Sequence, residues 1–429
     1  MSTQLTAILD DRVAGTLTRL DQGRLRFDYD DDYRDRPDAT PLSVSLPTQV
    51  ASHSDRAITP WLWGLLPDNE AVLSRWARHF HVSISSPFSL LSTPVGEDCP
   101  GAVRFAPPDE LDRVLERPGT VTWLNEDGVA QRLRELREDS TAWLGRTFAG
   151  QFSLAGAQAK TALLFEDGRW GVPSGATPTT HILKPAVAGF DDHDLNEHLC
   201  LDAARRCGLL VARTHVEQFA GESAIVVDRY DRVNRNGSIL RIHQEDLCQA
   251  LGVPPSRKYQ NEGGPGPAGI ARLIRRVMPP SIADSALARF ADALIWNWIV
   301  GGTDGHAKNY SLIIAGDQVR LAPLYDIASA LPYGTHEKKL RLAMTIGGDY
   351  RLYPWRNPWP AAARDLGLDA DTLMTRVDEL TARAPDAFRN AADIEAVKHL
   401  DRELPDKVVW LIADRAARCR AALGLTGAT

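Results

Sequence analysis

A long apolar stripe that stops at a glycine pair constrains this chain more than any other feature. The stripe recurs at offsets 0, 3, 4, 7, 8 and 11, the spacing of one buried helix face, in Leu287, Phe290, Ala291, Leu294, Ile295 and Trp298. Gly301-Gly302 then ends the helix, as glycine at a helix C-terminus does. A polar loop and a predicted hairpin follow, with strands Tyr310–Ile314 and Val319–Leu324. The sequence therefore predicts a polar loop that connects a buried helix to the edge of a small sheet.

The composition is that of an ordinary globular protein and excludes several classes. The 429 residues are 44% hydrophobic and 24% charged, and at about 100–200 residues per domain they predict two to four domains. Lys and Arg minus Asp and Glu gives 49 − 56 = −7. DNA binding through a broadly basic surface is not expected, because such binding neutralises phosphates with Lys and Arg. The five scattered cysteines do not form a disulfide framework.

The sequence carries no sign of membrane insertion or secretion. No apolar run reaches about 18 residues, the shortest stretch typical of a transmembrane helix. The start, Met1-Ser2-Thr3-Gln4, lacks a charged segment followed by an apolar one. We therefore expect a cytoplasmic protein without a membrane partner.

The first of three expected units is residues 1–108, which we predict to be β-rich. Short apolar runs at Thr6–Leu9, Val13–Leu17 and Leu25–Tyr29 are separated by turn signals. A helical stretch is expected at about 66–80.

The second unit, residues 109–232, is predicted to be a strand-rich lobe with helices at 125–137 and around Leu199–Cys207. Its expected strands are 161–165, 169–172, 180–184, 215–219 and 223–229. The third unit, residues 233–429, is mostly helical and contains the long helix and the hairpin described above.

The polar loop after the long helix carries the strongest chemical signal. Asp304 and Asn309 have four residues between them, and Asp326 stands just after the hairpin. Protein kinases have this spacing between a catalytic Asp and a metal-binding Asn, with a second metal-binding Asp further on. One carboxylate then faces the attacking hydroxyl, while the amide oxygen and the other carboxylate converge on Mg²⁺. On the spacing alone, an Asp/Asn turn that caps a helix and opens a hairpin remains an alternative.

A cation and a carboxylate upstream fit the same chemistry. Lys184 ends the apolar strand His181-Ile-Leu-Lys184, and Glu197 follows thirteen residues later at the start of a helix. Kinases use a strand Lys to hold nucleotide phosphates and a helix carboxylate to orient it. For Glu197, a first-turn carboxylate favoured by the helix dipole is an equally good explanation.

Two further segments complete the candidate nucleotide site. The loop Ser153–Lys160 is rich in small residues, which let backbone N–H groups approach a phosphate. It is not a Walker A motif, because the second Gly is missing and a strand follows. Val227-Asp228-Arg229-Tyr230 leaves a strand at the lobe junction, where backbone groups would contact an adenine; an ordinary strand end explains it equally well. No H-E-x-x-H, paired C-x-x-C or G-x-S-x-G motif occurs.

Taken together, these segments resemble the HipA family of bacterial serine/threonine kinase toxins. The matching stretches follow the family order over about 180 residues: Ser153–Leu164, Thr177–Lys184, Asn196-Glu197, Asp228–Arg232, Gln244–Gly252, Lys258-Tyr259 with Gly263–Gly266, Thr303–Asn309 and Leu324–Ser329. Gly64-Leu-Leu-Pro-Asp-Asn69 also matches. The resemblance implies an α+β fold with two kinase-like lobes, a β-rich N-terminal subdomain and a mostly helical C-terminal lobe.

The resemblance implies a role for each candidate residue. Asp304 would be the catalytic base, Asn309 and Asp326 would bind Mg²⁺, and Lys184 would contact the phosphates of ATP. The phosphate loop would be Ala155, Gly156, Ala157, Gln158, Ala159 and Lys160. The adenine pocket would be Asp228, Arg229, Tyr230, His306, Ala307, Lys308, Asn309 and Tyr325. Ser153 matches the serine that such kinases autophosphorylate. Ala159 and Asp228 depart from the family, which often has a polar residue and Glu there.

The resemblance also implies partners. Family substrates are aminoacyl-tRNA synthetases, notably glutamyl-tRNA synthetase, and a small HipB-like helix-turn-helix antitoxin supplies most of the operator binding. The leading hypothesis is an Mg²⁺- and ATP-dependent serine/threonine kinase that acts as a toxin. The alternative is a pseudokinase that serves only as a co-repressor, although Lys184, Asp304, Asn309 and Asp326 are all present. A small-molecule kinase is a third hypothesis, because the catalytic core does not specify the acceptor.

Overall fold

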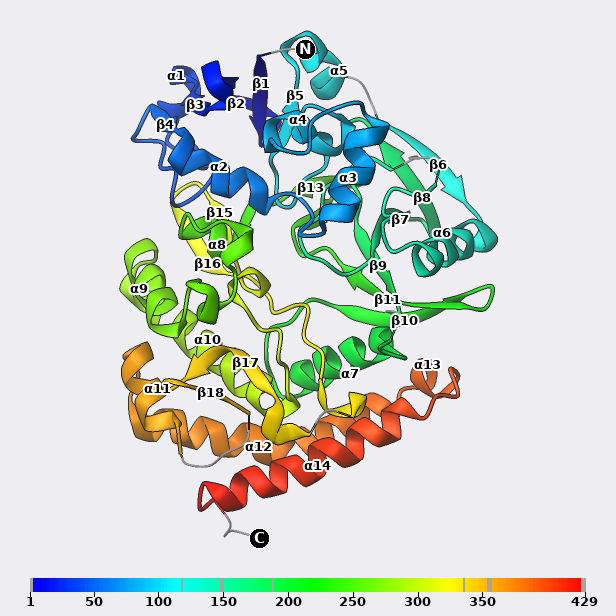
Figure 1. Ribbon diagram of the computed structural model, residues 1–429, viewed down its shortest axis with the longest axis vertical. Helices are drawn as coiled ribbons and strands as arrows, with labels where there is room; N and C mark the ends of the chain where they lie inside the picture. Colours follow the sequence, from blue (N-terminus) through cyan, green and yellow to red (C-terminus); the bar gives the residue numbers. More distant parts are fainter. Residues whose placement is uncertain are drawn as a thin grey trace.

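The structure is a computed structural model that describes residues 3–425 apart from 117–118, 147–149, 187–188, 335 and 353–356. In Figure 1 the N-terminal region lies at one end of the molecule and the C-terminal helices lie at the other, with a second sheet between them. None of the described helices is long and apolar enough to cross a membrane. All five cysteines are buried and unpaired.

The N-terminal region is built on a five-stranded antiparallel sheet with the order β4-β3-β2-β1-β5. Its strands are β1 Gln4–Leu9, β2 Arg12–Arg19, β3 Leu25–Tyr29, β4 Ser52–Ser54 and β5 Arg104–Ala106. Its helices are α1 Asp31–Arg34, α2 Asp55–Gly64, α3 Glu70–His79, α4 Pro87–Leu91 and α5 Leu111–Glu116. Apolar side chains of the sheet, including Leu17 and Phe27, pack against Trp61 of α2 and Trp76 of α3, which excludes water from this core.

The second sheet has six antiparallel strands in the order β10-β11-β9-β7-β8-β6. They are β6 Thr120–Leu124, β7 Thr161–Glu166, β8 Arg169–Ser174, β9 His181–Pro185, β10 Thr214–Phe219 and β11 Glu222–Asp228. Helix α6, Glu126–Glu138, begins at the N-cap Asn125 and packs Val129 and Leu133 against the sheet. Helix α7, His193–Arg206, faces the helical lobe. In the sheet, Lys184 of β9 lies opposite Ile225 of β11.

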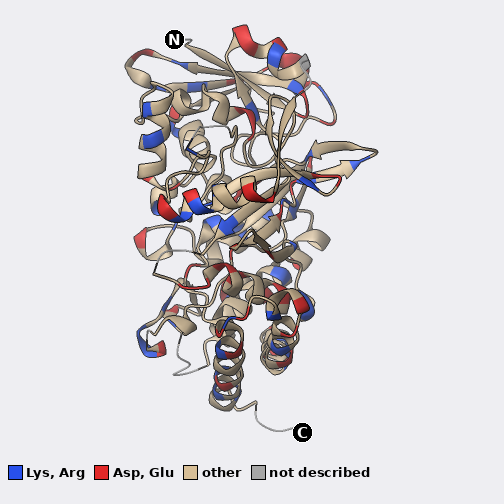
Figure 2. Cartoon of the chain, turned by 90° about the vertical axis from the view of Figure 1, so that its right-hand side faces the viewer, with Lys and Arg blue, Asp and Glu red and all other residues tan. Residues whose placement is uncertain are grey.

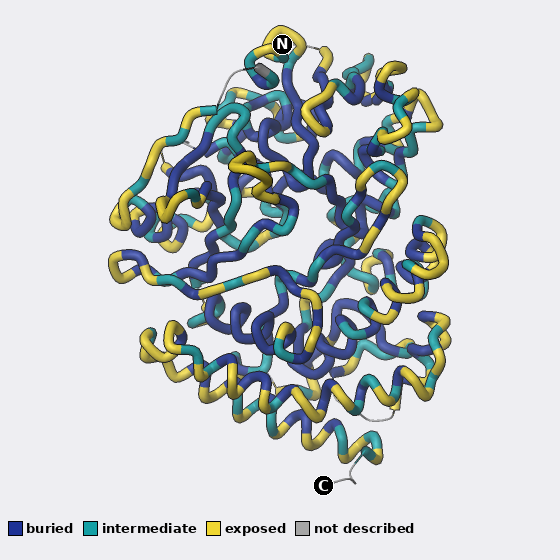
Figure 3. Tube along the Cα trace, turned by 180° about the vertical axis from the view of Figure 1, so that it is seen from behind, coloured by how far each residue is buried: buried dark blue, intermediate teal, exposed yellow. Residues whose placement is uncertain are grey.

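The described residues of the C-terminal lobe are mostly helical but include three small sheets. Its helices are α8 Leu247–Ala250, α9 Pro267–Val277, α10 Pro280–Val300, α11 Trp359–Leu366, α12 Ala370–Ala392, α13 Glu395–Lys398 and α14 Leu404–Ala422. Its strands are β12 Arg232–Arg235, β13 Ser238–Arg241, β14 Gln244–Asp246, β15 Ser311–Ala315, β16 Gln318–Leu321, β17 Arg341–Ile346 and β18 Asp349–Arg351. Figure 3 shows buried and exposed residues alternating along α12 and α14, as in amphipathic surface helices.

The predicted stripe on α10 is confirmed. Leu287, Phe290 and Ile295 are fully buried, and Gly301 ends the helix with a φ of +69°, a conformation that glycine adopts without strain. The hairpin that follows is β15 and β16, which turns through the expected residues 315–318. Strand β14 pairs with the other edge of β15, so the hairpin becomes a three-stranded sheet beside the polar loop.

One local expectation is corrected. The helical stretch expected at 66–80 begins only at Glu70, because the side chain of Asn69 caps α3 and Pro67 belongs to a turn before it. Helix α2 precedes that turn, and its sequence carries a proline at position 60 that masks the helical pattern. The hairpin β17–β18 lies within the mostly helical lobe and turns at Gly347-Gly348, where both residues have positive φ.

The N-terminal region contacts both lobes. Gly101 N donates to Asp231 at 2.7 Å near the end of the second sheet. Val44 N donates to Glu245 at 2.9 Å, and Gln249 donates to the carbonyl oxygen of Trp61 at 2.9 Å, so the same region also binds β14 and α8 of the helical lobe. Its core includes Phe152 and Ala162 as well. The division at residues 108 and 232 stays a prediction.

Candidate active site

A cleft of about 650 Å³ lies where the N-terminal region, the second sheet and the helical lobe meet. Asp68 lines it from the N-terminal region, Lys184 from β9, and Asp304 from the loop after α10. Residues far apart in sequence therefore share one cavity, which is the usual form of a small-molecule site.

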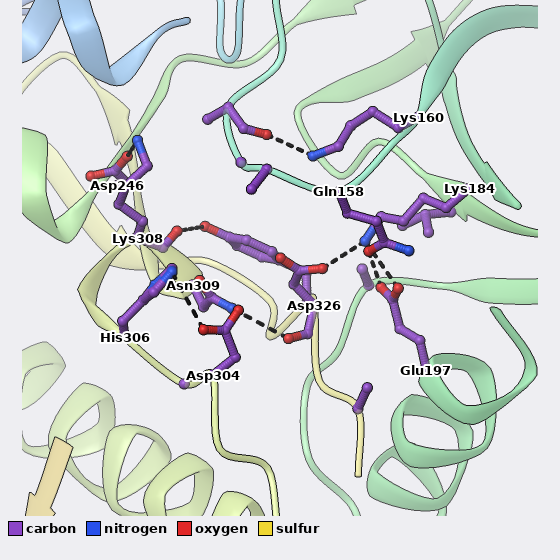
Figure 4. Close-up of a pocket in the computed structure, with 18 of the residues that line it drawn as sticks. Gln158, Lys160, Lys184, Glu197, Asp246, Asp304, His306, Lys308, Asn309 and Asp326 are labelled. Carbon is purple, nitrogen blue, oxygen red and sulfur yellow. Dashed lines mark hydrogen bonds and ion pairs between the residues drawn. The ribbon is translucent and has the colours of Figure 1, made fainter. Parts of the chain in front are cut away.

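Lys184 is the charged centre of this cleft. Its Nζ donates to both carboxylate oxygens of Glu197, at 2.8 and 3.0 Å, and to Oδ1 of Asp326 at 2.7 Å (Figure 4). Burial alone would lower the pKa of Lys184, but Asp326 and Glu197 outweigh it and raise that pKa, so the ammonium stays protonated. Glu197 lies one turn inside α7 rather than in its first turn, so the helix dipole does not explain it.

Asp326 is held in a backbone conformation that few side chains adopt, with a φ of +58°. Burial alone would raise the pKa of its carboxyl group, but the charges of Lys184 and Lys160 outweigh burial and lower it well below its ordinary value. The segment after Asp326 is fixed to α7, because Asn196 donates to Ser329 O at 2.8 Å and accepts from Ser329 N at 3.0 Å. The carboxylate is therefore ionised and fixed in position.

The loop that carries Asp304 is packed on the end of α10. A Cβ at Gly302 would lie 2.3 Å from Oδ1 of Asn297, so only glycine allows this close approach. Asn297 in turn donates to the hydroxyl of Tyr310 at 3.1 Å, which fixes the far end of the loop. The side chain of Asp304 is 66% exposed and lies at the cleft.

The two predicted metal ligands lie side by side. Nδ2 of Asn309 donates to the backbone oxygen of Asp326 at 3.4 Å, which leaves the amide oxygen as the group that a metal would take. Asp326 contributes the carboxylate. Among the described residues no group of three or more His, Cys, Asp or Glu side chains could hold a metal. Two oxygen ligands suit Mg²⁺, which keeps several waters and takes other oxygens from substrate phosphates.

Lys308 joins the loop after α10 to the N-terminal region. Its Nζ lies 3.1 Å from Oδ2 of Asp246 and 3.4 Å from Oδ1 of Asp68. Lys258 binds the other oxygen of Asp68 at 3.0 Å. Burial alone would raise the pKa of Asp68, but the two lysines outweigh it and lower that pKa. The ammonium of Lys308 is thus already paired with protein carboxylates.

The small-residue loop forms one wall of the cleft. Gly156 has a φ of +99°, and a Cβ there would lie 2.8 Å from the Nζ of Lys160. Lys160 donates to Ala155 O at 2.7 Å. Gly156 O accepts from Asp68 N at 3.0 Å, so the loop rests on the N-terminal region. Burial, and then the neighbouring Lys184, lower the pKa of Lys160 to about 8.

The opposite end of the cleft is aromatic. The rings of Tyr230 and Tyr325 are stacked with centroids 5.9 Å apart. The Tyr325 hydroxyl donates to Lys308 O at 2.8 Å, and the Tyr230 hydroxyl donates to Gln244 at 2.8 Å. Both polar groups are satisfied within the protein, so the flat ring faces are what this end offers a planar ligand.

Comparison with known proteins decides the family. Residues 152–388 match the HipA-like C-terminal domain, and residues 5–106 match the HipA N-terminal domain. The chain belongs to the HipA family. The candidate kinase Y4mE of Sinorhizobium fredii is 33% identical over 418 residues, which cover 96% of this chain and 98% of that protein. The serine/threonine-protein kinase toxin HipA of Shewanella oneidensis is 29% identical over 402 residues, which cover 90% and 88%.

A solved structure shares the HipA fold. A chain of the Shewanella oneidensis MR-1 complex of HipA, HipB and operator DNA matches with a TM-score of 0.81 and 25% identity over 97% of both chains. The expected family and the two-lobed α+β fold are therefore confirmed.

Most of the residues that the HipA resemblance singled out line the cleft, but four are placed differently. Ala159 packs against the N-terminal core, and Ala307 is buried in the core of the helical lobe. Arg229 turns its guanidinium away to Asp231 and other buried partners, so only its backbone can face a nucleotide. Ser153 is fully buried and donates to Leu65 O at 2.6 Å. The start of the small-residue loop is therefore packed inside the protein.

Three further residues line the cleft without a role that the sequence pattern indicates: Asp68, Lys258 and Tyr259. Each lies in a stretch that matches the HipA family, within Gly64–Asn69 or Lys258-Tyr259. The sequence therefore marks these residues as parts of family motifs. It does not show that Lys258 pairs with Asp68, because the two are 190 residues apart and meet only in the fold.

Proposed function

We propose that this HipA-family kinase transfers the γ-phosphoryl group of Mg²⁺-bound ATP to a serine or threonine of a protein, as the toxin of a toxin–antitoxin module. We further propose an aminoacyl-tRNA synthetase as the substrate and Ser153 as the site of autophosphorylation. The observation that carries the proposal is the ion pairing of Lys184 with both Glu197 and Asp326, beside a loop that holds Asp304 and Asn309.

In the proposed reaction, Lys184 and Lys160 bind the nucleotide phosphates, and Asn309 and Asp326 hold Mg²⁺, which neutralises charge on them. The acceptor hydroxyl forms a bond to the γ-phosphorus while the bond to the β-phosphate oxygen breaks. Asp304 accepts the hydroxyl proton, and ADP leaves. The protein contributes mainly positioning and electrostatic stabilisation, which is how phosphoryl transfer is catalysed elsewhere.

A HipB-like antitoxin is the partner that we propose for DNA binding. The matching solved structure is a complex of HipA, HipB and operator DNA. The net charge of −7 supports the same arrangement, since the chain has no excess of cations for a DNA surface of its own.

The decisive experiment is to incubate the dephosphorylated protein with γ-labelled ATP, Mg²⁺ and a bacterial lysate, and to map labelled sites by mass spectrometry. We expect label on a serine or threonine of an aminoacyl-tRNA synthetase, and label lowered on the order of 10²–10⁴-fold with Asp304→Ala. Label on a different protein would show that the substrate is not a synthetase, while the kinase activity would be confirmed. If neither a lysate protein nor the chain itself is labelled, the chain is a catalytically silent co-repressor. If only a small molecule is labelled, the chain is a small-molecule kinase.

A further inference from the structure

Tyr259 makes the closest contact to the proposed catalytic base. Its hydroxyl donates to Oδ1 of Asp304 at 2.6 Å. Burial, and then the hydrogen bond to Asp304, raise the pKa of Tyr259 well above its ordinary value, so the phenol keeps its proton and remains a donor.

Both neighbours of the Asp304 carboxylate approach the same oxygen. Nε2 of His306 lies 4.0 Å from Oδ1, and the rings of Tyr259 and His306 meet edge to face with centroids 4.9 Å apart. Among the described residues no side chain hydrogen-bonds to Oδ2. The exposed side chain of Asp304 therefore has one oxygen fixed by protein and one available to a ligand.

The segment that presents Tyr259 is fixed by the side chains on both sides of it. Lys258 binds Asp68 of the N-terminal region at 3.0 Å. Gln260 donates to the hydroxyl of Thr345 on β17 at 3.2 Å and accepts from Thr345 N at 2.8 Å. Tyr259 lies between these two anchors, so its hydroxyl has little freedom to move.

We propose that Tyr259 is a positioning residue for Asp304, which holds Oδ1 so that Oδ2 faces the acceptor hydroxyl. This inference rests on the proposed function. A base whose orientation is fixed by a third group is a recurring arrangement in nucleophilic catalysis. Without the phenol, the Asp304 side chain can rotate into solvent, and the reacting oxygens are misplaced more often.

The same anchors connect the base to the nucleotide end of the cleft. Asp68 holds Lys258 through its carboxylate and Gly156 of the phosphate loop through its backbone N–H. Replacing Asp68 by Asn keeps the backbone bond and removes the charge. The N-terminal region therefore takes part in orienting the base, although it supplies no reacting group.

The test compares Tyr259→Phe with Tyr350→Phe, a matched change on β18 outside the cleft, in the full-length chain. The measurements are phosphate incorporated into the chain and lysate proteins, KM for ATP, nucleotide Kd and Tm. We expect Tyr259→Phe to lower kcat on the order of 10²-fold, with KM for ATP, nucleotide affinity and Tm unchanged. We expect no further loss when Tyr259→Phe is added to Asp304→Ala, because it acts through that carboxylate.

Each other outcome overturns the inference. Unchanged kcat in Tyr259→Phe would show that the base needs no such support. Higher turnover would make Tyr259 a plug that the acceptor displaces. A fall in Tm, or an equal loss in the Asp304→Ala background, would make its role structural. In all three cases the wild-type protein still phosphorylates protein and the proposed function survives; a wild-type protein that transfers no phosphate fails both.

Discussion

The backbone conformation of Asp326 allows a variant that tests its proposed role as a metal ligand separately from the role of Asp304 as the base. A φ of +58° is tolerated by Asn better than by most residues, so Asp326→Asn removes the charge and keeps the backbone. We expect this variant to lose affinity for Mg·ATP while its Tm stays near that of the wild type. Isothermal titration with and without Mg²⁺ measures the loss. If Asp326→Asn binds Mg·ATP as tightly as the wild type does, Asp326 is not a metal ligand.

Asp304 is expected to behave differently, because it would act on the acceptor and not on the nucleotide. Asp304→Ala should lower kcat on the order of 10²–10⁴-fold, the usual contribution of a general base. Its Kd for Mg·ATP should be unchanged. Single-turnover kinetics with labelled ATP measure both quantities, and undiminished turnover would contradict the assignment.

We expect Lys160 to make nucleotide binding depend on pH. Its pKa is lowered to about 8, whereas that of Lys184 is raised. The protonated form of Lys160 attracts phosphates, so ATP affinity should be highest below pH 8 and fall as the pH rises through this value. Lys160→Met should bind ATP weakly at every pH from 7 to 9 and lack this dependence. A wild-type Kd that stays constant across this range would show that Lys160 makes no electrostatic contribution to binding.

At the scale of elements, the phosphate loop is anchored at its beginning and free to present small residues at its middle. Ser153 is fully buried and donates to Leu65 O, so a phosphate there has no room. Phosphorylation adds about −1.5 to −2 charges at pH 7. We expect the modified loop to leave its site and ATP affinity to fall more than about tenfold, since adjacent like charges cost several kcal/mol.

The matched variant for this switch is Ser153→Ala. It should lose about 1 kcal/mol of stability with the hydrogen bond, keep its nucleotide affinity, and resist silencing by prolonged incubation with Mg·ATP. Mass spectrometry verifies the phosphate before titration. If the phosphorylated wild-type protein binds ATP as tightly as the unmodified one, Ser153 is not a switch.

Elements whose apolar residues recur at regular spacing were predictable from the sequence. Elements that depend on contacts with residues far away in the sequence were not. Helix α10 and the β15–β16 hairpin follow from apolar spacing and a Gly-Asp turn. The turn at 65–69 and its contact with Gly156 do not, because short-range patterns carry no information on which distant backbone groups pair. Glu197 could be explained in two ways from sequence, and its place one turn inside α7 together with its hydrogen bond to Lys184 distinguishes them.

At the scale of the whole molecule, the net charge of −7 disfavours DNA binding by the chain alone. In Figure 2, Lys and Arg are interspersed with Asp and Glu along the elements shown. We expect the isolated chain to bind an operator duplex weakly, and its complex with a basic antitoxin to bind tightly with an affinity that falls steeply with salt. Fluorescence anisotropy over a salt series measures this. Tight, sequence-specific binding by the isolated chain would contradict the proposed division of labour.

The ties between the N-terminal region and both lobes bear on how spent nucleotide departs. Val44 and Trp61 bind the helical lobe, and Gly101 binds the end of the second sheet, so hinging the lobes apart would break contacts on both sides at once. The phosphate loop has fewer such contacts near its middle, chiefly that of Gly156 O with Asp68 N. We therefore expect ADP from the proposed reaction to leave past this loop, and the lifetime of the product complex to depend on how often the loop lifts, as in enzymes where product release limits kcat.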